Sequence, residues 1–416
     1  MSSYYLAITR EGCEIMENHN KEVLFINARI YTPDRIIEQG FLRISDGIIK
    51  EIDTMNNLSN KDENVQRGIT IINLRGQFLI PGFIDVHVHG GGGFDVMSGR
   101  PEDIEGMSIY HASNGTTTFL ATTLTAESET IKQALRAVKV AMQKGTAGAS
   151  VAGVHLEGPF LNPICCGAQN PAHICAPSLE ALKLFQECSG DTIALLTIAP
   201  EMPGAMDMIR YAVSQGITVS IGHSAASYEA VQQAVKLGAR QITHLFNGMN
   251  PLHHREPGVP GAGLIIDELA VELICDHIHV HPDLIGMIFR AKPVDKVLLI
   301  TDCMLASGLA DGQYQLGELP VIMKEGQVRL CNSDGSLGSL AGSCLTMDKA
   351  LTQAMKATSL PIEHILPALT INPARQVGLD KHKGSIELGK DADLVVLNEH
   401  WQVMSTFVKG CNVYRL

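Results

Sequence analysis

Positive charge is scarce in this sequence. Its 416 residues include 32 Lys and Arg against 44 Asp and Glu, which leaves a formal net charge of −12. Non-specific binding of nucleic acid needs a basic surface, so this balance argues against a nucleic-acid partner. An anionic small molecule is still compatible with the chain, provided that one or two cations are placed beside it.

Long apolar runs and paired cysteines are also missing. No apolar run approaches the ~20 residues that a membrane span requires, so we expect no membrane association. Residues 1–10 have no apolar segment behind a basic one, which argues against a secretory signal. The ten cysteines form no C-x-x-C pair and indicate reduced thiols and a cytoplasmic location. A soft metal site at Cys165, Cys166 and Cys175 is a weaker alternative, because its spacing matches no common zinc pattern.

The middle of the chain alternates apolar strands with helical patterns. Strands are predicted at residues 78–89, 116–123, 151–157, 193–200, 217–224, 241–246, 271–279 and 297–302. Amphipathic helices are predicted between most of them, for example at 128–144, 178–188, 204–215 and 228–237. Eight such strands are typical of a (β/α)8 TIM-type barrel. Residues 312–343 break the alternation and are predicted to be a hairpin insertion before a helix at 346–357.

Both ends of the chain are rich in strand-forming residues. Short β patterns occur at 23–31 and 41–49, with a hairpin turn at Ser45-Asp46-Gly47, and again at 394–397 and around 406–408. We therefore predict an α/β protein in which both termini build one small β-sandwich domain. Its residues are 1–77 and 378–416, and the barrel occupies 78–377.

Polar side chains gather at the carboxyl ends of the predicted barrel strands. They are His87 and His89, Glu157, His223, His244, His279 and Asp302, on six of the eight strands. All these ends open on one face of a barrel, where such enzymes carry their chemistry. Residues two apart on a strand point to the same side, so His87 and His89 can bind one ion. Convergence at one barrel mouth favours a shared metal site over separate hydrogen-bonded strand ends.

These side chains suit a hydrolytic metal. Imidazoles with one carboxylate fit zinc or ferrous iron, and three protein ligands leave a position open for water. A bound water then ionises near neutral pH and supplies a hydroxide nucleophile. Asp302 is our candidate for moving the proton to a leaving amine. The loop after His244 adds Asn247 and Arg255, which can hold an anionic substrate.

Several motifs together resemble the N-acetylglucosamine-6-phosphate deacetylases of the amidohydrolase superfamily. They are His87-Val88-His89, the run HLEGPF at 155–160, Gly222-His223-Ser224, residues 243–255 and Thr301-Asp302. The segments Asn372-Pro373-Ala374 and 389–394 resemble the closing β-sandwich of the superfamily. The similarity covers nearly the whole chain.

The resemblance implies hydrolysis of N-acetylglucosamine 6-phosphate to glucosamine 6-phosphate and acetate. It implies that Glu157, His223 and His244 hold a divalent metal, and that His87 and His89 can bind a second ion. Asp302 would be the proton shuttle, and His279 would touch the sugar and polarise the acetyl carbonyl. Arg255 would reach the phosphate from the neighbouring subunit of a homodimer. The other implied substrate contacts are Ala168, Gln169, Asn247, the Gly248 backbone, Leu340, Ala341 and Gly342.

Three alternative functions compete with this interpretation. A cyclic-amide hydrolase such as a dihydropyrimidinase uses a carboxylated Lys, and the third strand offers Glu157 with no Lys, which disfavours it. The galactosamine epimer of the substrate stays open, and His277, where a glycine is usual, could narrow the sugar pocket. A non-catalytic sugar-phosphate sensor would be expected to lack Asp302 or a ligand, and both are present here.

Overall fold

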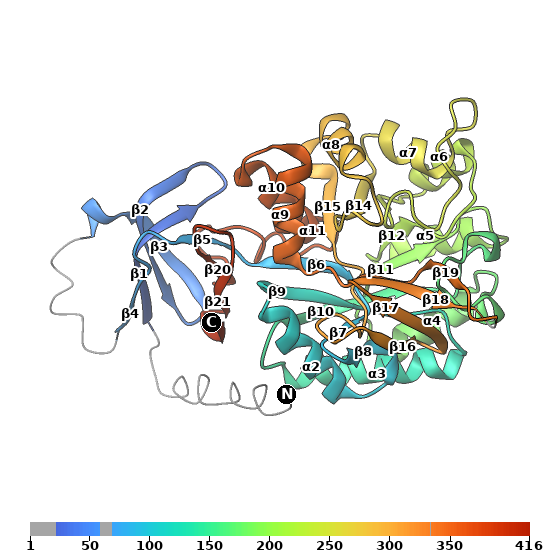
Figure 1. Ribbon diagram of the computed structural model, residues 1–416, viewed down its shortest axis with the longest axis horizontal. Helices are drawn as coiled ribbons and strands as arrows, with labels where there is room; N and C mark the ends of the chain where they lie inside the picture. Colours follow the sequence, from blue (N-terminus) through green and yellow to red (C-terminus); the bar gives the residue numbers. More distant parts are fainter. Residues whose placement is uncertain (1–21, 59–68, 333) are drawn as a thin grey trace.

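The computed structural model describes residues 22–58, 69–332 and 334–416, which form a small sheet domain beside a larger α/β body (Figure 1). The predicted lack of a secretory signal concerns residues 1–10, which lie outside the described residues. Across the described ranges, every helix is too short or too polar to cross a membrane.

Eight parallel strands build the larger body, and each pairs with its neighbour in chain order. They are β6 (Phe83–Val88), β9 (Thr116–Thr122), β10 (Ser150–Glu157), β11 (Ile193–Ile198), β12 (Thr218–Ile221), β13 (Gln241–Ile242), β14 (Ala270–Ile274) and β15 (Val297–Ile300). The ring is completed just beyond the last strand, where Val88 bridges Cys303 and the Asp302 amide donates to the His87 carbonyl at 2.9 Å. The predicted (β/α)8 barrel is confirmed.

Helices surround the barrel because each buries one apolar stripe against it. In α3 (Ser128–Lys144) the buried residues include Ile131, Leu135 and Val138, at the three- and four-residue spacing of one helix face. The other helices are α2 (Pro101–Ala112), α4 (Leu179–Ser189), α5 (Ala205–Ser214), α6 (Tyr228–Lys236), α7 (Gly258–Ile265), α8 (Pro282–Ala291), α9 (Met347–Thr358), α10 (Ile362–Leu369) and α11 (Ile371–Gln376). Short 3-10 turns lie at Met55–Asn57, Val96–Ser98, Pro163–Cys165, Pro171–His173 and Val294–Lys296.

The small domain is built from both ends of the chain, as predicted. Its strands are β1 (Glu22–Tyr31), β2 (Ile36–Ser45), β3 (Ile48–Thr54), β4 (Ile69–Asn73), β5 (Phe78–Pro81), β20 (Leu394–Leu397), β21 (Val403–Val408) and β22 (Cys411–Arg415). β20 pairs antiparallel with β5 and so joins the two termini. Inside the domain, the rings of Phe25 and Phe407 meet edge to face at 5.0 Å.

The predicted strand at 78–89 is two strands. β5 belongs to the small domain and β6 to the barrel, and the chain changes sheet at Gly82. A Cβ at Gly82 would lie 2.2 Å from the Thr117 side chain, so only glycine fits this close crossing. The domain boundary at residue 78 stays a prediction. In the strand pairing, the chain passes from the small sheet to the barrel at Gly82, four residues after that boundary.

The predicted hairpin insertion is a four-stranded antiparallel sheet. It comprises β16 (Gly312–Leu316), β17 (Leu319–Lys324), β18 (Gln327–Cys331) and β19 (Leu337–Leu340). Leu316, Met323 and Val328 pack against Leu124 and Met304, which lie beyond the carboxyl ends of β9 and β15. The insertion therefore sits over the barrel mouth. A two-stranded ribbon, β7 (Gly90–Gly91) with β8 (Phe94–Asp95), follows β6.

Candidate metal centre and active site

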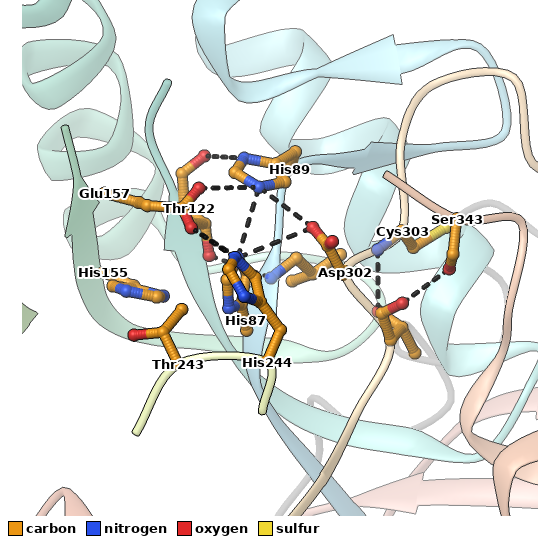
Figure 2. A network of polar contacts seen from close by, with 12 residues as sticks. His87, His89, Thr122, His155, Glu157, Thr243, His244, Asp302, Cys303 and Ser343 are labelled. Atoms are coloured by element: carbon orange, nitrogen blue, oxygen red, sulfur yellow. Dashed lines mark hydrogen bonds and ion pairs between the residues drawn. The ribbon is translucent and has the colours of Figure 1, made fainter. Parts of the chain in front are cut away.

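The five predicted metal ligands and the predicted proton shuttle, Asp302, meet at the barrel mouth. Within the described residues they form two groups that could hold a metal, His87 with His89 and Asp302, and Glu157 with His223 and His244. All six are buried. Figure 2 shows five of them pointing toward one another from the carboxyl ends of β6, β10, β13 and β15. Cys165, Cys166 and Cys175 join neither group, so the alternative thiolate site has no support.

The group of Glu157, His223 and His244, called the first group from here on, has the geometry of a metal site. His223 Nε2 and His244 Nε2 lie 3.3 and 3.2 Å from Glu157 Oε1, and 3.2 Å from each other. Ligand atoms around a tetrahedral zinc ion, at about 2.0–2.2 Å from it, lie about 3.3–3.6 Å apart. Glu157, His223 and His244 thus form one face of such a tetrahedron, which leaves the fourth corner open. The residues fit a divalent metal.

Glu157 also connects this group to the second one. His87 Nε2 lies 3.5 Å from Glu157 Oε1, and His89 Nε2 lies 3.3 Å from Glu157 Oε2. Asp302 Oδ1 completes the second group at 3.5 Å from His87 Nε2 and 3.2 Å from His89 Nε2. A single carboxylate therefore faces all four imidazoles, an arrangement that suits two neighbouring ions with Glu157 between them.

Each of the four imidazoles is held by a contact to its other nitrogen. These contacts of Nδ1 are His223 to the Cys165 carbonyl at 2.9 Å, His244 to the Asn247 carbonyl at 3.1 Å, His89 to the Thr122 carbonyl at 3.2 Å and His87 to Glu272 Oε2 at 2.9 Å. Carbonyl and carboxylate oxygens accept hydrogen bonds, so each Nδ1 carries the proton and each Nε2 presents its lone pair to the cluster.

Glu272 was missed by sequence reasoning. It lies within β14, fully buried, and besides His87 it accepts from the His244 amide at 3.1 Å and from Gln241 Nε2 at 2.5 Å. The signal was present, because a carboxylate in the middle of the strand AVELI is costly unless it has a partner. What the sequence could not give was the partner, 185 residues away.

Opposed charges set the protonation of the cluster. Burial raises the pKa of Glu157, but His87, His223 and His244 outweigh it and hold that pKa well below its ordinary value. Burial lowers the pKa of His89, but Asp302 and Glu157 raise it to about 9. Burial likewise raises the pKa of Asp302, and the imidazoles, led by His89, bring it down to about 2. The carboxylates thus favour positive charge on the imidazoles. A divalent ion that bound there would replace the imidazole protons and supply that positive charge.

Three of these six residues have backbone in the left-handed region. The φ angles are 48° at His223, 29° at His244 and 50° at Asp302. Each lies two residues beyond its strand, β12, β13 or β15, and not on the strand as predicted. Non-glycine residues in this region cost about 1–3 kcal/mol and persist where surrounding structure enforces them, commonly at functional sites.

A cavity of about 360 Å³ opens over the cluster. Of the predicted substrate contacts, it is lined by Ala168, Gln169, Asn247, Gly248, His279, Leu340 and Gly342. Ala341 is fully buried and does not line the cavity. Arg255 is exposed in a loop and does not reach the cavity of its own chain. Arg329, which sequence reasoning did not select, does line it.

Two lining residues are fixed by neighbours. His279 lies in the loop after β14, and its Nδ1 is 2.7 Å from Asp276 Oδ2, which leaves Nε2 for another partner. Gln169 donates to Glu157 Oε2 at 2.7 Å and accepts from the Thr125 amide at 2.7 Å. Gln169 therefore supports the ligand Glu157 as well as lining the cavity.

Two other histidines have roles outside the cavity. His277 Nε2 contacts the Gln353 carbonyl of α9 at 3.1 Å, and His277 is not among the lining residues. The expectation that its ring narrows the sugar pocket is therefore wrong for this cavity. His155 Nε2 contacts Thr197 Oγ1 at 2.7 Å, and its ring packs edge to face on His87 at 4.5 Å.

Comparison with known proteins agrees with this geometry. The model of the Amidohydrolase family matches residues 78–413. An N-acetylglucosamine-6-phosphate deacetylase of Lysinibacillus sphaericus is 40% identical over 83% of this chain and 87% of the relative. An N-acetylgalactosamine-6-phosphate deacetylase of Escherichia coli O157:H7 is 34% identical over 92% of this chain and 97% of the relative. Among solved structures, the chain resembles a mutant of the Mycobacterium smegmatis N-acetyl-D-glucosamine-6-phosphate deacetylase in complex with N-acetyl-D-glucosamine-6-phosphate. The TM-score is 0.86 and the identity is 29%, over 94% of this chain and 99% of that chain.

Proposed function

Because the chain belongs to the amidohydrolase family, as its motifs predicted, we propose that it hydrolyses N-acetylglucosamine 6-phosphate to glucosamine 6-phosphate and acetate. The observation that carries this proposal is the meeting of Glu157, His223 and His244 around one point, with Asp302 beside them at the floor of a cavity. The named relatives support the substrate class.

Glu157, His223 and His244 would hold the primary ion, zinc or ferrous iron. Such an ion, when bound, polarises the acetamide carbonyl and activates a water. His87 and His89, with Asp302 beside them, would hold a second ion. The imidazole and carboxylate donors suit both metals, and their contacts do not select between them.

Asp302 moves the proton. Its low pKa keeps it ionised at neutral pH, so it can accept a proton from the attacking water. It then returns the proton to the amine that leaves. His279 is fixed by Asp276 through Nδ1, and in its doubly protonated form its Nε2–H would donate to the acetyl carbonyl oxygen, where negative charge develops. Gln169 keeps Glu157 in place while the substrate is bound.

The remaining contacts surround the sugar phosphate. Asn247 and the Gly248 backbone bind the phosphate from one side of the cavity, and Leu340 and Gly342 contact the sugar from the insertion. Arg255 reaches the phosphate of the neighbouring subunit in a homodimer, a placement supported by its exposure on its own chain. A cytoplasmic location agrees with the nine free thiols of the described residues.

The test is acetate release by metal-loaded protein from N-acetylglucosamine 6-phosphate. We expect turnover, and we expect Asp302→Asn to lower kcat by about 100-fold or more, since proton transfer contributes about 10²–10⁴-fold. Full activity of Asp302→Asn would overturn the shuttle assignment. No acetate from the wild-type protein, combined with tight binding of the sugar phosphate, would instead indicate a sensor.

The galactosamine epimer is the second candidate. The Escherichia coli relative named for that substrate is 34% identical over nearly its whole length, so similarity alone does not separate the epimers. Measuring kcat/KM on both epimers with the same preparation decides between them. A higher value for N-acetylgalactosamine 6-phosphate would replace the first proposal.

A further inference from the structure

Arg329 in β18 carries a positive charge to the wall of the cavity. Among the described residues that line the cavity, it alone is a Lys or Arg. The other charged side chains of the lining are Glu157 and Asp302, and both face the imidazole cluster. The cavity of a single chain therefore has one permanent cation, on the side formed by the insertion.

The guanidinium of Arg329 lacks a carboxylate partner among the described residues. Its Nη1 donates to the carbonyl of Gly338, in the neighbouring strand β19, at 3.2 Å. A guanidinium has five N–H donors, so most of its hydrogen-bonding capacity is free. The side chain is half-buried. A partly buried cation without a counter-ion is costly, unless an anion is bound there when the site is filled.

The proposed substrate brings such an anion. A phosphate monoester carries about −1.5 to −2 charges at neutral pH, and one arginine does not neutralise it. The whole chain is acidic, with a net charge of −12, so the surrounding field does not attract a dianion. Planar guanidinium matches phosphate oxygens in two parallel hydrogen bonds.

We propose that Arg329 binds the phosphate group of the substrate from within its own chain, opposite the cation that Arg255 supplies from the neighbouring subunit. The inference rests on the proposed function and adds a specificity-determining residue to it. Because β18 lies between β17 and β19, Arg329 is presented by a paired strand, which limits the ordering needed on binding.

The experiment compares Arg329→Ala with wild-type protein on N-acetylglucosamine 6-phosphate and on unphosphorylated N-acetylglucosamine. We expect KM for the phosphorylated sugar to rise about 10- to 100-fold with kcat little changed, as for a lost hydrogen bond to a charged group. Turnover of the unphosphorylated sugar should stay within about 2-fold. The inhibition constant of inorganic phosphate should rise by a factor similar to that of KM. Lys324→Ala, an exposed cation on β17, is the matched control and should change neither value.

Equal losses on both sugars would show that Arg329 only supports the fold through Gly338, and would overturn the proposal. An unchanged KM and an unchanged inhibition constant of phosphate would also overturn it. Calorimetric binding of the sugar phosphate needs no turnover. If wild-type protein bound the ligand without releasing acetate, the proposed function would fail, and weaker binding by Arg329→Ala would still support this inference.

Discussion

Replacing Glu272 by Gln should weaken one metal site more than the other. One oxygen of Glu272 accepts from the ring of His87 at 2.9 Å and from the backbone amide of His244 at 3.1 Å. The ring contact is to Nδ1 of His87, the nitrogen that faces away from the second group, whereas the contact with His244 does not involve its ring. The amide of Gln keeps an acceptor oxygen and loses the charge. Its NH2 group can be accommodated, because Gln241 Oε1 is buried without a partner and can accept after an amide flip.

The magnitude follows from the two contacts. A hydrogen bond to a charged group contributes about 1.5–3 kcal/mol, which is about 10- to 150-fold in metal affinity at the group of His87, His89 and Asp302. Loss of such supporting partners typically costs about 10- to 100-fold. At the group of Glu157, His223 and His244, a weakened neutral hydrogen bond accounts for about 10-fold or less.

The assay is a titration of metal-free protein with zinc at fixed pH, with bound metal per chain measured by mass spectrometry at each free concentration. Wild-type protein should bind two equivalents, and Glu272→Gln should retain the first and bind the second more weakly. Glu268→Gln, an exposed neighbour just before β14, controls for loss of one negative charge. Equal weakening of both equivalents, or weakening of the first alone, would refute the reasoning.

Two further predictions concern the dimer and the small domain. Mixing Arg255→Ala and Asp302→Asn subunits should restore about a quarter of wild-type activity, because half of the random dimers carry one intact shared site; no recovery in the mixture would count against a shared site. Lys383 is buried 2.6 and 2.9 Å from carboxylate oxygens of Asp393 and Asp391, and Lys383→Met should cost about 3–5 kcal/mol of unfolding free energy at pH 7. Burial lowers the pKa of Lys383, but Asp393 outweighs it and raises that pKa above the ordinary 10.5, so this stabilisation is complete below pH 10.5 and disappears as pH rises through the raised value. Denaturant titrations between pH 7 and 11 measure the difference in unfolding free energy between wild-type protein and Lys383→Met, and exposed Lys381→Met is the control. A difference that stays constant across this pH range would contradict the prediction.

The barrel and most ligands could be predicted because both follow from short-range patterns. A strand that is buried on both faces is apolar throughout, so a polar residue at its end stands out, as Glu157 does on β10. Barrel geometry then brings distant strand ends to one mouth, and the sequence does not have to specify each contact. His87, His223 and His244 could be assigned to one cluster on that basis alone.

Features that depend on pairing between distant segments were not predictable. The run from Phe78 to His89 is apolar enough to read as one strand, although the Pro81-Gly82 pair is a common break signal. Only the pairing of β5 with β20 reveals that it serves two sheets. Arg329 likewise lies in the insertion, far from every recognised motif, and its place in the cavity wall depends on how that sheet lies over the barrel mouth.

The left-handed backbone at His223, His244 and Asp302 explains why the ligands lie beyond their strands. On a strand, side chains alternate between the barrel interior and the helices, so a strand position directs an imidazole along only one of two fixed directions. Leaving the strand at Ile221, Ile242 and Ile300 frees the next residues to turn toward the barrel axis. The conformational cost is about 1–3 kcal/mol at each position, and a bound ion offsets it because it binds the folded arrangement and not the unfolded chain. If a metal binds as proposed, part of its binding energy would hold these three turns, which also bring the Asp302 carboxylate to 3.2 Å from His89 Nε2.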